Sequence, residues 1–209
     1  MIKVVLADDH AIVRGGLKQI LEADASMRVV FEANNGIEAF EFVSENTVDV
    51  VVMDITMPGR NGLETLKDIK RLKPYLPVII LSMHPEDQYA IRVIKAGAAG
   101  YLSKESDPKE LVDAIKKACA GRRYISTEVA ELLAHHIERG PTDEPHKKLS
   151  DREFEIFLLI AQGKSLTEIA KDIDISIKTV STYRTRLIDK TALSTNSAMT
   201  KYCVERGLI

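Results

Sequence analysis

The chain has 209 residues, which is enough for two compact domains of ordinary size, and its 45% apolar and 29% charged residues are typical of a globular protein. The net charge of −2 excludes a polycationic nucleic-acid binder, so any binding of nucleic acid must depend on local charge. No apolar run approaches the roughly 20 residues that span a bilayer. The first residues lack a signal-peptide pattern, and the two distant cysteines indicate neither a disulfide framework nor a zinc site. We therefore expect a cytoplasmic protein with no membrane partner.

Short apolar runs alternate with helical patterns from residue 2 to about residue 120. The runs are Val4–Ala7, Val29–Phe31, Val48–Met53, Val78–Leu81 and Gly100–Leu102. Between the runs, apolar residues recur at the three- and four-residue spacing of amphipathic helices. Strands that are apolar on both faces and separated by helices predict a parallel sheet covered on both sides. We therefore predict a doubly wound α/β domain with five parallel strands.

The remaining residues predict helices without strands. Residues 122–138 have a helical pattern that Ser126 can open, and residues 139–148 contain two prolines, a glycine and no apolar residue, which indicates a linker. After Leu149 the pattern is helical throughout. Capping signals open the expected segments Phe154–Ile160, Leu166–Ile173, Ile177–Lys190 and Ser197–Arg206. We predict a small all-α domain over residues 149–209, after a first domain over 1–121 and a linker helix and flexible linker over 122–148.

Five polar residues follow directly on apolar runs of the first domain. They are Asp8, Asp9, Asp54, Ser82 and Lys104. Because the carboxyl ends of parallel strands meet at one edge of a sheet, where open α/β sheets form their ligand sites, we expect these side chains to converge. A single aspartate at a strand end is usually a helix cap or turn residue, but five such residues at four strand ends are hard to explain by coincidence.

Three converging carboxylates repel one another unless a cation is present. Mg²⁺ suits this set because it prefers oxygen ligands and binds through one or two carboxylates together with waters and phosphate oxygens. We assign Asp8, Asp9, Asp54 and the Thr56 carbonyl as its ligands and Asp54 as a nucleophile that forms an acyl phosphate. Lys104 would supply a positive charge and Ser82 a hydroxyl to a phosphoryl group. His10 and His84 flank this set, and we interpret them as solvated loop histidines, with tuning of the phosphoryl lifetime as the alternative.

The segments Leu166–Ile173 and Ile177–Lys190, joined by a three-residue turn, have the spacing of a helix-turn-helix unit. The second helix carries four basic residues and one acidic residue, whereas residues 149–209 as a whole carry nine basic and eight acidic residues. Val180, Leu187 and Ile188 occupy its inner side. This concentration of positive charge favours a reader of the major groove. A solvated basic amphipathic helix is the alternative.

The set Asp8, Asp9, Asp54, Ser82 and Lys104, with Met57-Pro58-Gly59-x-x-Gly62 and Gly97-Ala98-x-Gly100-Tyr101-Leu102, resembles the receiver domain of two-component response regulators. The resemblance spans residues 2–120. It implies a flavodoxin-like fold and Mg²⁺-dependent transfer of a phosphoryl group from a sensor histidine kinase to Asp54. It also implies that Ser82 and Tyr101 form a switch pair, in which the hydroxyl moves toward the phosphoryl group and the ring turns inward.

The segments Leu149-Ser150-x-Arg152-Glu153, Glu168-Ile169-Ala170 and Ser176-x-Lys178-Thr179-Val180-x-Thr182-Tyr183 resemble the LuxR-type four-helix domain. Joined to a receiver, this is the architecture of NarL/FixJ-type response regulators. The resemblance implies contacts to double-stranded DNA. Phosphate contacts are assigned mainly to Lys178, Thr179, Tyr183, Arg184 and Lys190, base contacts to Ser181, Thr182 and Thr185, and Arg186 lies on the same outer side. Where the family usually has a glycine after the lysine, this chain has Thr191-Ala192-Leu193-Ser194.

Taken together, the residues and the resemblance imply a transcription factor controlled by phosphorylation rather than an enzyme. Phosphorylation is expected to release the all-α domain and to favour a homodimer, and RNA polymerase is a further candidate partner. One rival is a hydrolase with an aspartyl-phosphate intermediate. Haloacid-dehalogenase-type enzymes carry an aspartate two residues after the nucleophile, where this chain has Thr56. A second rival is a regulator that uses the first domain only for dimerisation, against which the complete acidic set argues.

Overall fold

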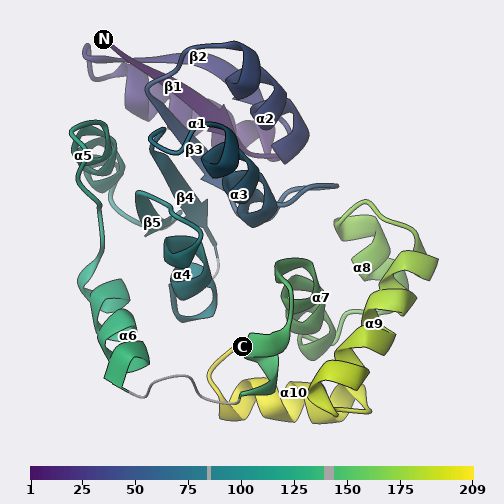
Figure 1. Cartoon of the computed structure of the whole chain (residues 1–209). Helices are drawn as coiled ribbons and strands as arrows, with labels where there is room; N and C mark the ends of the chain where they lie inside the picture. The colour runs from purple at the N-terminus through teal and green to yellow at the C-terminus, as the bar shows by residue number, and fades with distance from the viewer. Residues whose placement is uncertain (84–85, 139–143) are drawn as a thin grey trace. The chain divides into compact units, whose positions relative to one another are not determined.

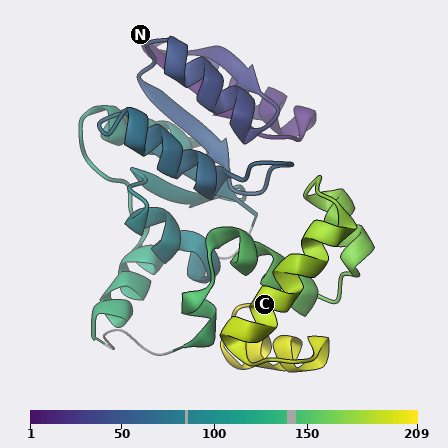
Figure 2. The ribbon, with the colours of Figure 1, turned by 45° about the vertical axis from the view of Figure 1, so that its right-hand side comes forward.

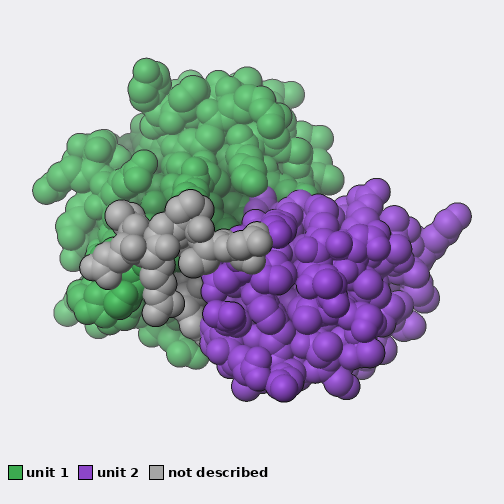
Figure 3. Space-filling model, turned by 60° about the horizontal axis from the view of Figure 1, so that its bottom comes forward, with its two compact units in different colours: residues 1–135 green, residues 136–209 purple. Residues whose placement is uncertain are grey.

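The computed structural model describes residues 1–83, 86–138 and 144–209. These form two compact units, residues 1–135 and residues 136–209, which Figure 3 distinguishes by colour. Among the described helices, none is long and apolar enough to cross a membrane. We describe the two units separately.

A five-stranded sheet forms the centre of the first unit. The strands are β1 (Ile2–Ala7), β2 (Met27–Ala33), β3 (Val50–Asp54), β4 (Val78–Ser82) and β5 (Gly100–Ser103). Their order is β2-β1-β3-β4-β5, and every pair is parallel. Each of the predicted apolar runs therefore forms a strand, and the predicted doubly wound sheet is confirmed.

Helices cover both faces of this sheet (Figure 1). They are α1 (Ala11–Glu22), α2 (Gly36–Glu45), α3 (Gly62–Leu72), α4 (Glu86–Lys95) and α5 (Pro108–Cys119). Val4, Leu6 and Val52 point to the face that α1 and α5 cover, where they join one buried apolar cluster. Their neighbours Val5 and Met53 point to the opposite face, because successive side chains of a strand alternate, and they are fully buried there. Burial of both faces explains why the strands read as continuous apolar runs.

Local capping signals mark the starts of four helices of the first unit. Asn35 and Asn61 accept hydrogen bonds from backbone N–H groups at the starts of α2 and α3, and Asp107 does so at the start of α5. Helix α6 (Thr127–Glu138) follows, and the Ser126 hydroxyl accepts a bond of 3.1 Å from the backbone N–H of Val129, as the sequence predicts.

The second unit contains α7 (Asp151–Ala161), α8 (Leu166–Asp172), α9 (Ile177–Thr191) and α10 (Asn196–Glu205). Helix α9 contacts α7 and α8, and α10 contacts α7 (Figure 2). The capping boxes predicted at Ser150 and Ser165 are both formed, and Ser176 caps α9. Thr195 caps the last helix. Phe154, Phe157 and most of the other apolar residues of α7 are buried because this central helix contacts the three others.

Two local features differ from the pattern that the sequence predicts. Residues 145–148, which we expected to belong to an unstructured linker, form a 3₁₀ helix, η1 (Pro145–Lys148). The side chain of His146 holds this turn, because its Nδ1 lies 2.7 Å from the Tyr202 hydroxyl and its ring lies beside Phe154. Helix α9, predicted to end at Lys190, ends at Thr191, and the next residue, Ala192, adopts the left-handed conformation with φ of 58°.

Candidate functional site: an acidic cluster and a basic recognition helix

The strand register brings the predicted polar residues to one edge of the sheet. Ala7 of β1 pairs with Met53 of β3, so Asp8 and Asp54 follow directly at the same level. Asp54 pairs in turn with Leu81 of β4, and Ser82 pairs with Ser103 of β5, which places Lys104 at that edge as well. Residues that are up to 96 positions apart in the sequence are thereby adjacent in space.

Lys104 joins two of the three carboxylates. Its Nζ lies 2.6 Å from Oδ2 of Asp54 and 2.7 Å from Oδ2 of Asp8. All three side chains are at least nine-tenths buried, so their charges interact with little screening by water. Asp9 is more accessible, with 31% of its side chain exposed.

Burial governs the protonation of Asp54. Its removal from water raises the pKa of the carboxyl from 3.8 to about 6, although the attraction and hydrogen bond of Lys104 act in the opposite direction. Repulsion from Asp8 adds to the rise. For Lys104, the two carboxylates outweigh burial and raise the pKa of the ammonium group. At neutral pH the cluster therefore holds a buried carboxylate whose charge is poorly stabilised by the protein alone.

The backbone around Asp54 is tightly packed. The Thr56 N–H donates a hydrogen bond of 3.3 Å to Oδ1 of Asp54. Gly62, the first residue of α3, lies against the same residue: a Cβ at this position would be 2.0 Å from the Asp54 carbonyl oxygen. Only glycine therefore allows α3 to begin here, and α3 in turn fixes the loop that follows Asp54.

The donor atoms fit a hard divalent cation. One ligand atom each of Asp8, Asp9, His10 and Asp54 can be chosen so that all lie within 4.8 Å of one another. Three of the four are carboxylate oxygens, which Mg²⁺ prefers. A cavity of about 380 Å³, lined in part by Asp54, Thr56 and Lys104, adjoins the cluster and offers space for a phosphoryl group.

The proposed switch residues are both buried. Ser82 ends β4 and is fully buried, and Tyr101 in β5 is 1% exposed. The ring of Tyr101 is thus already inside the unit. The roles of both residues in switching remain predictions. His84 lies outside the described residues.

In the second unit, α9 presents two distinct sides. Val180 and Leu187 are fully buried, and Ile188 is half-buried. The exposed residues among the predicted DNA contacts are Lys178, Thr179, Ser181, Thr182, Thr185, Arg186 and Lys190. Positions 178, 181, 182 and 185 follow the three- and four-residue helical spacing and so share the outward side of α9.

Several of the predicted DNA-contacting side chains, including Arg184, Arg186 and Lys190, have partners within the unit. The guanidinium of Arg184 donates hydrogen bonds of 3.2 and 3.3 Å to Asn196 at the start of α10, and Arg186 lies over the ring of Tyr183 at 5.8 Å. Lys190 Nζ lies 2.6 Å from Glu153, a buried carboxylate whose pKa is lowered because the Lys190 and Ser150 contacts outweigh the effect of burial. Any contact of Arg184 or Lys190 with DNA requires a rearrangement or sharing of these bonds.

Comparison with known proteins identifies both units. The family model of the response regulator receiver domain matches residues 4–116, and that of bacterial regulatory proteins of the luxR family matches residues 147–202. The chain belongs to the response regulators. The response regulator UvrY of Escherichia coli strain K12 is 40% identical over 209 residues, which cover all of this chain and 96% of UvrY. The resemblance inferred from the sequence motifs is confirmed.

Further relatives cover the same extent of this response regulator. The response regulator GacA of Pseudomonas aeruginosa strain PAO1 is 36% identical over 210 residues, covering all of this chain and 98% of GacA. Among solved structures, RcsB of Salmonella enterica serovar Typhimurium, bound to promoter rprA with the phosphomimetic BeF3⁻, matches with a TM-score of 0.66 and 29% identity over 96% of this chain and 97% of RcsB. The chain is thus a response regulator with a receiver domain and a LuxR-type DNA-binding domain.

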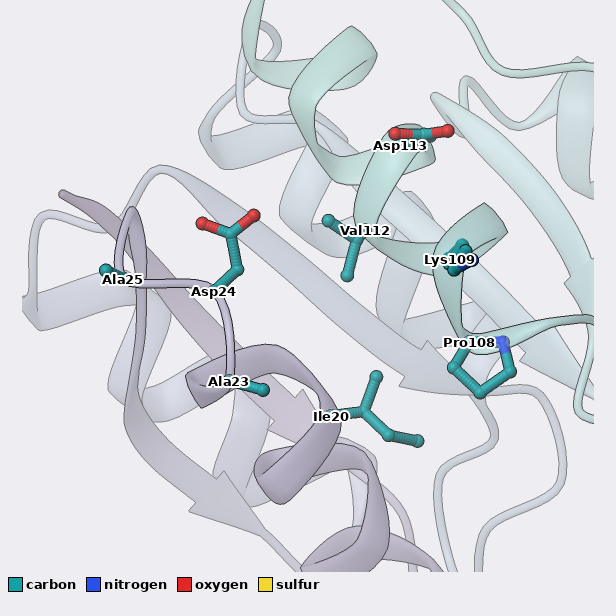
Figure 4. Close-up of a pocket in the computed structure, with 8 residues that line it drawn as sticks. All are labelled: Ile20, Ala23, Asp24, Ala25, Pro108, Lys109, Val112 and Asp113. Carbon is teal, nitrogen blue, oxygen red and sulfur yellow. The ribbon is translucent and has the colours of Figure 1, made fainter.

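The receiver has another, larger cavity of about 760 Å³ between α1 and α5, shown in Figure 4. Ile20 from α1 and Val112 from α5 line it, together with Asp24, Lys109 and Asp113. Its lining includes none of the predicted site residues, and the acidic cluster adjoins the smaller cavity instead. Size alone therefore does not locate the functional site of this receiver.

The sequence interpretation missed the position of His10. Its Nδ1 lies 2.8 Å from Oδ1 of Asp9 and 3.4 Å from Oδ1 of Asp8, so the imidazole belongs to the acidic cluster. The sequence signal for this contact was the position of His10 directly after the two aspartates, at the start of α1. A histidine in a loop is more often solvated, and the sequence carries no information about the direction of its ring.

Proposed function

We propose that this response regulator is a transcription factor that is switched by transfer of a phosphoryl group from a sensor histidine kinase to Asp54. The observation that carries this proposal is the contact of Lys104 with Asp54 at 2.6 Å, inside a buried acidic cluster at the carboxyl edge of the sheet. We assign the domains as residues 1–121 for the receiver, 122–148 for the linker and 149–209 for the DNA-binding domain.

In the proposed transfer, a carboxylate oxygen of Asp54 attacks the phosphorus of a phosphohistidine. The P–N bond breaks, the electron pair stays on the imidazole of the kinase, and an acyl phosphate forms on Asp54. Lys104 can leave the Asp54 carboxylate and pair with a phosphoryl oxygen, and Ser82 would donate its hydroxyl to another. We assign Asp8, Asp9, Asp54 and the Thr56 carbonyl as ligands of Mg²⁺, which when bound offsets the charge of the carboxylates and the phosphoryl group.

The consequence of phosphorylation is a shift between two existing conformations. Moving such an equilibrium from mostly inactive to mostly active needs about 5 kcal/mol of differential stabilisation. We propose Ser82 and Tyr101 as the residues that couple the acyl phosphate to this shift. The phosphoryl group on Asp54 would act as a signal and not as an intermediate of hydrolysis. A hydrolase of the haloacid-dehalogenase type would need a carboxylic acid as general acid at position 56, where this chain has Thr56, and this favours a regulator over an enzyme.

DNA binding would use the outward side of α9. Lys178 can neutralise phosphates, while Ser181, Thr182 and Thr185 share the side that would face base edges in the major groove. A homodimer would present two such helices to half-sites about one helical turn apart. RNA polymerase is the further partner that we propose, and a cytoplasmic location follows from the need to reach chromosomal DNA.

Labelling with radioactive acetyl phosphate in the presence of Mg²⁺ tests the phosphoacceptor. Asp54→Asn should abolish the label, because the amide nitrogen and oxygen cannot form the acyl phosphate. Asp24→Asn is the matched control, since Asp24 pairs with Lys116 at 2.7 Å and is not part of the acidic cluster. Undiminished labelling of Asp54→Asn would refute the assignment.

Binding to a promoter fragment at several salt concentrations tests the DNA-contacting helix. Lys178→Ala should weaken binding to all sequences alike and reduce the salt slope by about one. Thr182→Ala should instead alter base preference in a selection from randomised sites. Lys201→Ala, on the exposed side of α10, is the control for a general loss of positive charge. If Lys178→Ala changed only sequence preference, its assignment as a phosphate contact would be wrong.

A further inference from the structure

An imidazole reaches into the acidic cluster of the receiver. His10 Nδ1 is 2.8 Å from Asp9 Oδ1 and 3.4 Å from Asp8 Oδ1, and the backbone N–H of His10 donates a hydrogen bond of 2.8 Å to Asp8 Oδ1. The side chain is therefore held beside both carboxylates by its own backbone. Its Nδ1 is one of the four candidate ligand atoms that lie within 4.8 Å of one another.

The imidazole has no other structural task in this part of the receiver. His10 occupies the position before α1, where a side chain commonly caps the helix, yet it makes no capping hydrogen bond. Two-thirds of its side chain is exposed, and it lines the cavity of about 380 Å³ together with Asp54, Thr56 and Lys104. The ring can therefore meet an ion that enters from solution without loss of packing in the core.

The distances match those of neighbouring ligands around one metal ion. Ligand atoms at about 2.1 Å from an octahedral ion lie about 3 Å apart when they are adjacent. The distances from His10 Nδ1 to Asp9 Oδ1 and Asp8 Oδ1 bracket this value. The carboxylates suit Mg²⁺ and Mn²⁺, whereas an imidazole nitrogen adds affinity for transition-metal ions and little for Mg²⁺.

We propose that His10 is a nitrogen ligand of the receiver's cation site and that it raises the affinity of this site for transition-metal ions more than its affinity for Mg²⁺. The proposal rests on the proposed function in that it uses the same acidic cluster. It assigns a mixed set of one nitrogen and three carboxylate groups where the sequence alone indicates oxygen ligands only. His10 Nδ1 and Asp9 Oδ1, which contact each other at 2.8 Å, would then both hold the ion.

Manganese is the probe that tests this assignment, because its paramagnetism reports both affinity and the identity of its ligands. The full-length protein is titrated with Mn²⁺ and followed by electron paramagnetic resonance, with Mg²⁺ as the competitor. Pulsed measurements on the bound ion should detect modulation from a directly coordinated nitrogen, and this modulation should disappear in His10→Gln. Loss of a residue that only contacts a metal ligand costs about 10- to 100-fold in metal affinity. Loss of a direct ligand in His10→Gln should therefore lower the Mn²⁺ affinity at least about tenfold, and the Mg²⁺ affinity by less.

His135→Gln is the matched control, since this exposed histidine of α6 should leave the nitrogen modulation intact. Absence of nitrogen modulation in the wild-type protein at saturating Mn²⁺, or its persistence in His10→Gln, would overturn the proposal and make His10 a residue that only orients Asp9. Asp8→Asn separates this inference from the proposed function. If Asp8→Asn bound Mn²⁺ and Mg²⁺ as tightly as the wild type, the acidic cluster itself would not be the cation site.

Discussion

The burial of Asp54 should make the receiver less stable at neutral pH than it would be with a neutral side chain at this position. The folded protein raises the pKa of this carboxyl from 3.8 to about 6. The folded state therefore holds the proton more tightly than the unfolded state does. Proton binding to Asp54 therefore stabilises the folded state. This stabilisation is fully present below about pH 3.8 and is lost as the pH rises through about 6.

The size of the effect follows from the pKa. At 1.36 kcal/mol for each tenfold change in proton affinity, the rise from 3.8 to about 6 corresponds to about 3 kcal/mol. Asp54→Asn, which imitates the neutral carboxyl, should raise the free energy of unfolding by up to about this amount at pH 8. At pH 5 the wild-type side chain is mostly protonated in the folded state, so the gain should shrink to roughly half.

Differential scanning calorimetry of the full chain in EDTA at pH 5 and pH 8 measures this difference. The transition that contains the receiver should shift upward by several degrees in Asp54→Asn at pH 8 and by less at pH 5. Asp24→Asn is a control of opposite sign: the contacts with Lys116 and Ser26 lower the pKa of Asp24, so this variant should lose stability at pH 8. Equal stability of Asp54→Asn and wild type at both pH values would refute the argument from burial.

Three further substitutions test contacts that hold the two sites in place. Lys190→Met should destabilise the DNA-binding unit by about 2 kcal/mol in urea unfolding, because it leaves the buried Glu153 without a charged partner. Ala192→Gly should raise the melting temperature by relieving a left-handed conformation that costs a residue with a Cβ about 1–2 kcal/mol. Gly62→Ala should abolish labelling by acetyl phosphate, since its Cβ would collide with the Asp54 carbonyl oxygen.

Each of these three expectations has a clear contrary result. A Lys190→Met variant that kept its stability but lost salt-dependent affinity for DNA would make Lys190 a phosphate contact rather than an internal partner. Ala198→Gly, within α10, is the control for Ala192→Gly and should destabilise by up to about 1 kcal/mol. Full labelling of Gly62→Ala with unchanged stability would show that α3 can move away from Asp54.

The topology of the receiver and the convergence of its acidic edge were predictable from the sequence. Parallel strands buried on both faces produce continuous apolar runs, and the residues that follow such runs must meet at one edge. Asp54 and Lys104 are 50 positions apart, yet the register of β3, β4 and β5 brings them to 2.6 Å. The capping boxes of α7 and α8 were equally predictable, because both partners of each box lie within four residues of sequence.

The pairing of individual side chains was not predictable, because it depends on rotamers that only tertiary packing selects. The sequence placed Lys190 on the basic helix α9 but gave no sign that its amine reaches Glu153 of α7. In the same way, the sequence predicted that His10 is solvated, and 66% of its side chain is exposed, but the contact of its ring with Asp9 was not predictable. Residues 145–148 form η1 because of a contact with Tyr202, which lies 56 positions from His146.

Both sites of the molecule share one electrostatic feature: each contains a lysine, predicted to bind an anion, that already contacts an acceptor within the protein. Lys104 contacts Asp54 and Asp8, and Lys190 contacts Glu153. Binding of a phosphoryl group or of DNA therefore exchanges one partner for another and gains only the difference between the two interactions. For Lys104 the proposed phosphorylation of Asp54 would favour the phosphoryl group, because it would remove the carboxylate charge of Asp54 and leave Asp8 as the remaining partner of the lysine. The proposed covalent step would thus release Lys104 from one of its two carboxylate partners and make its charge available to the phosphoryl oxygens that the same step adds to Asp54.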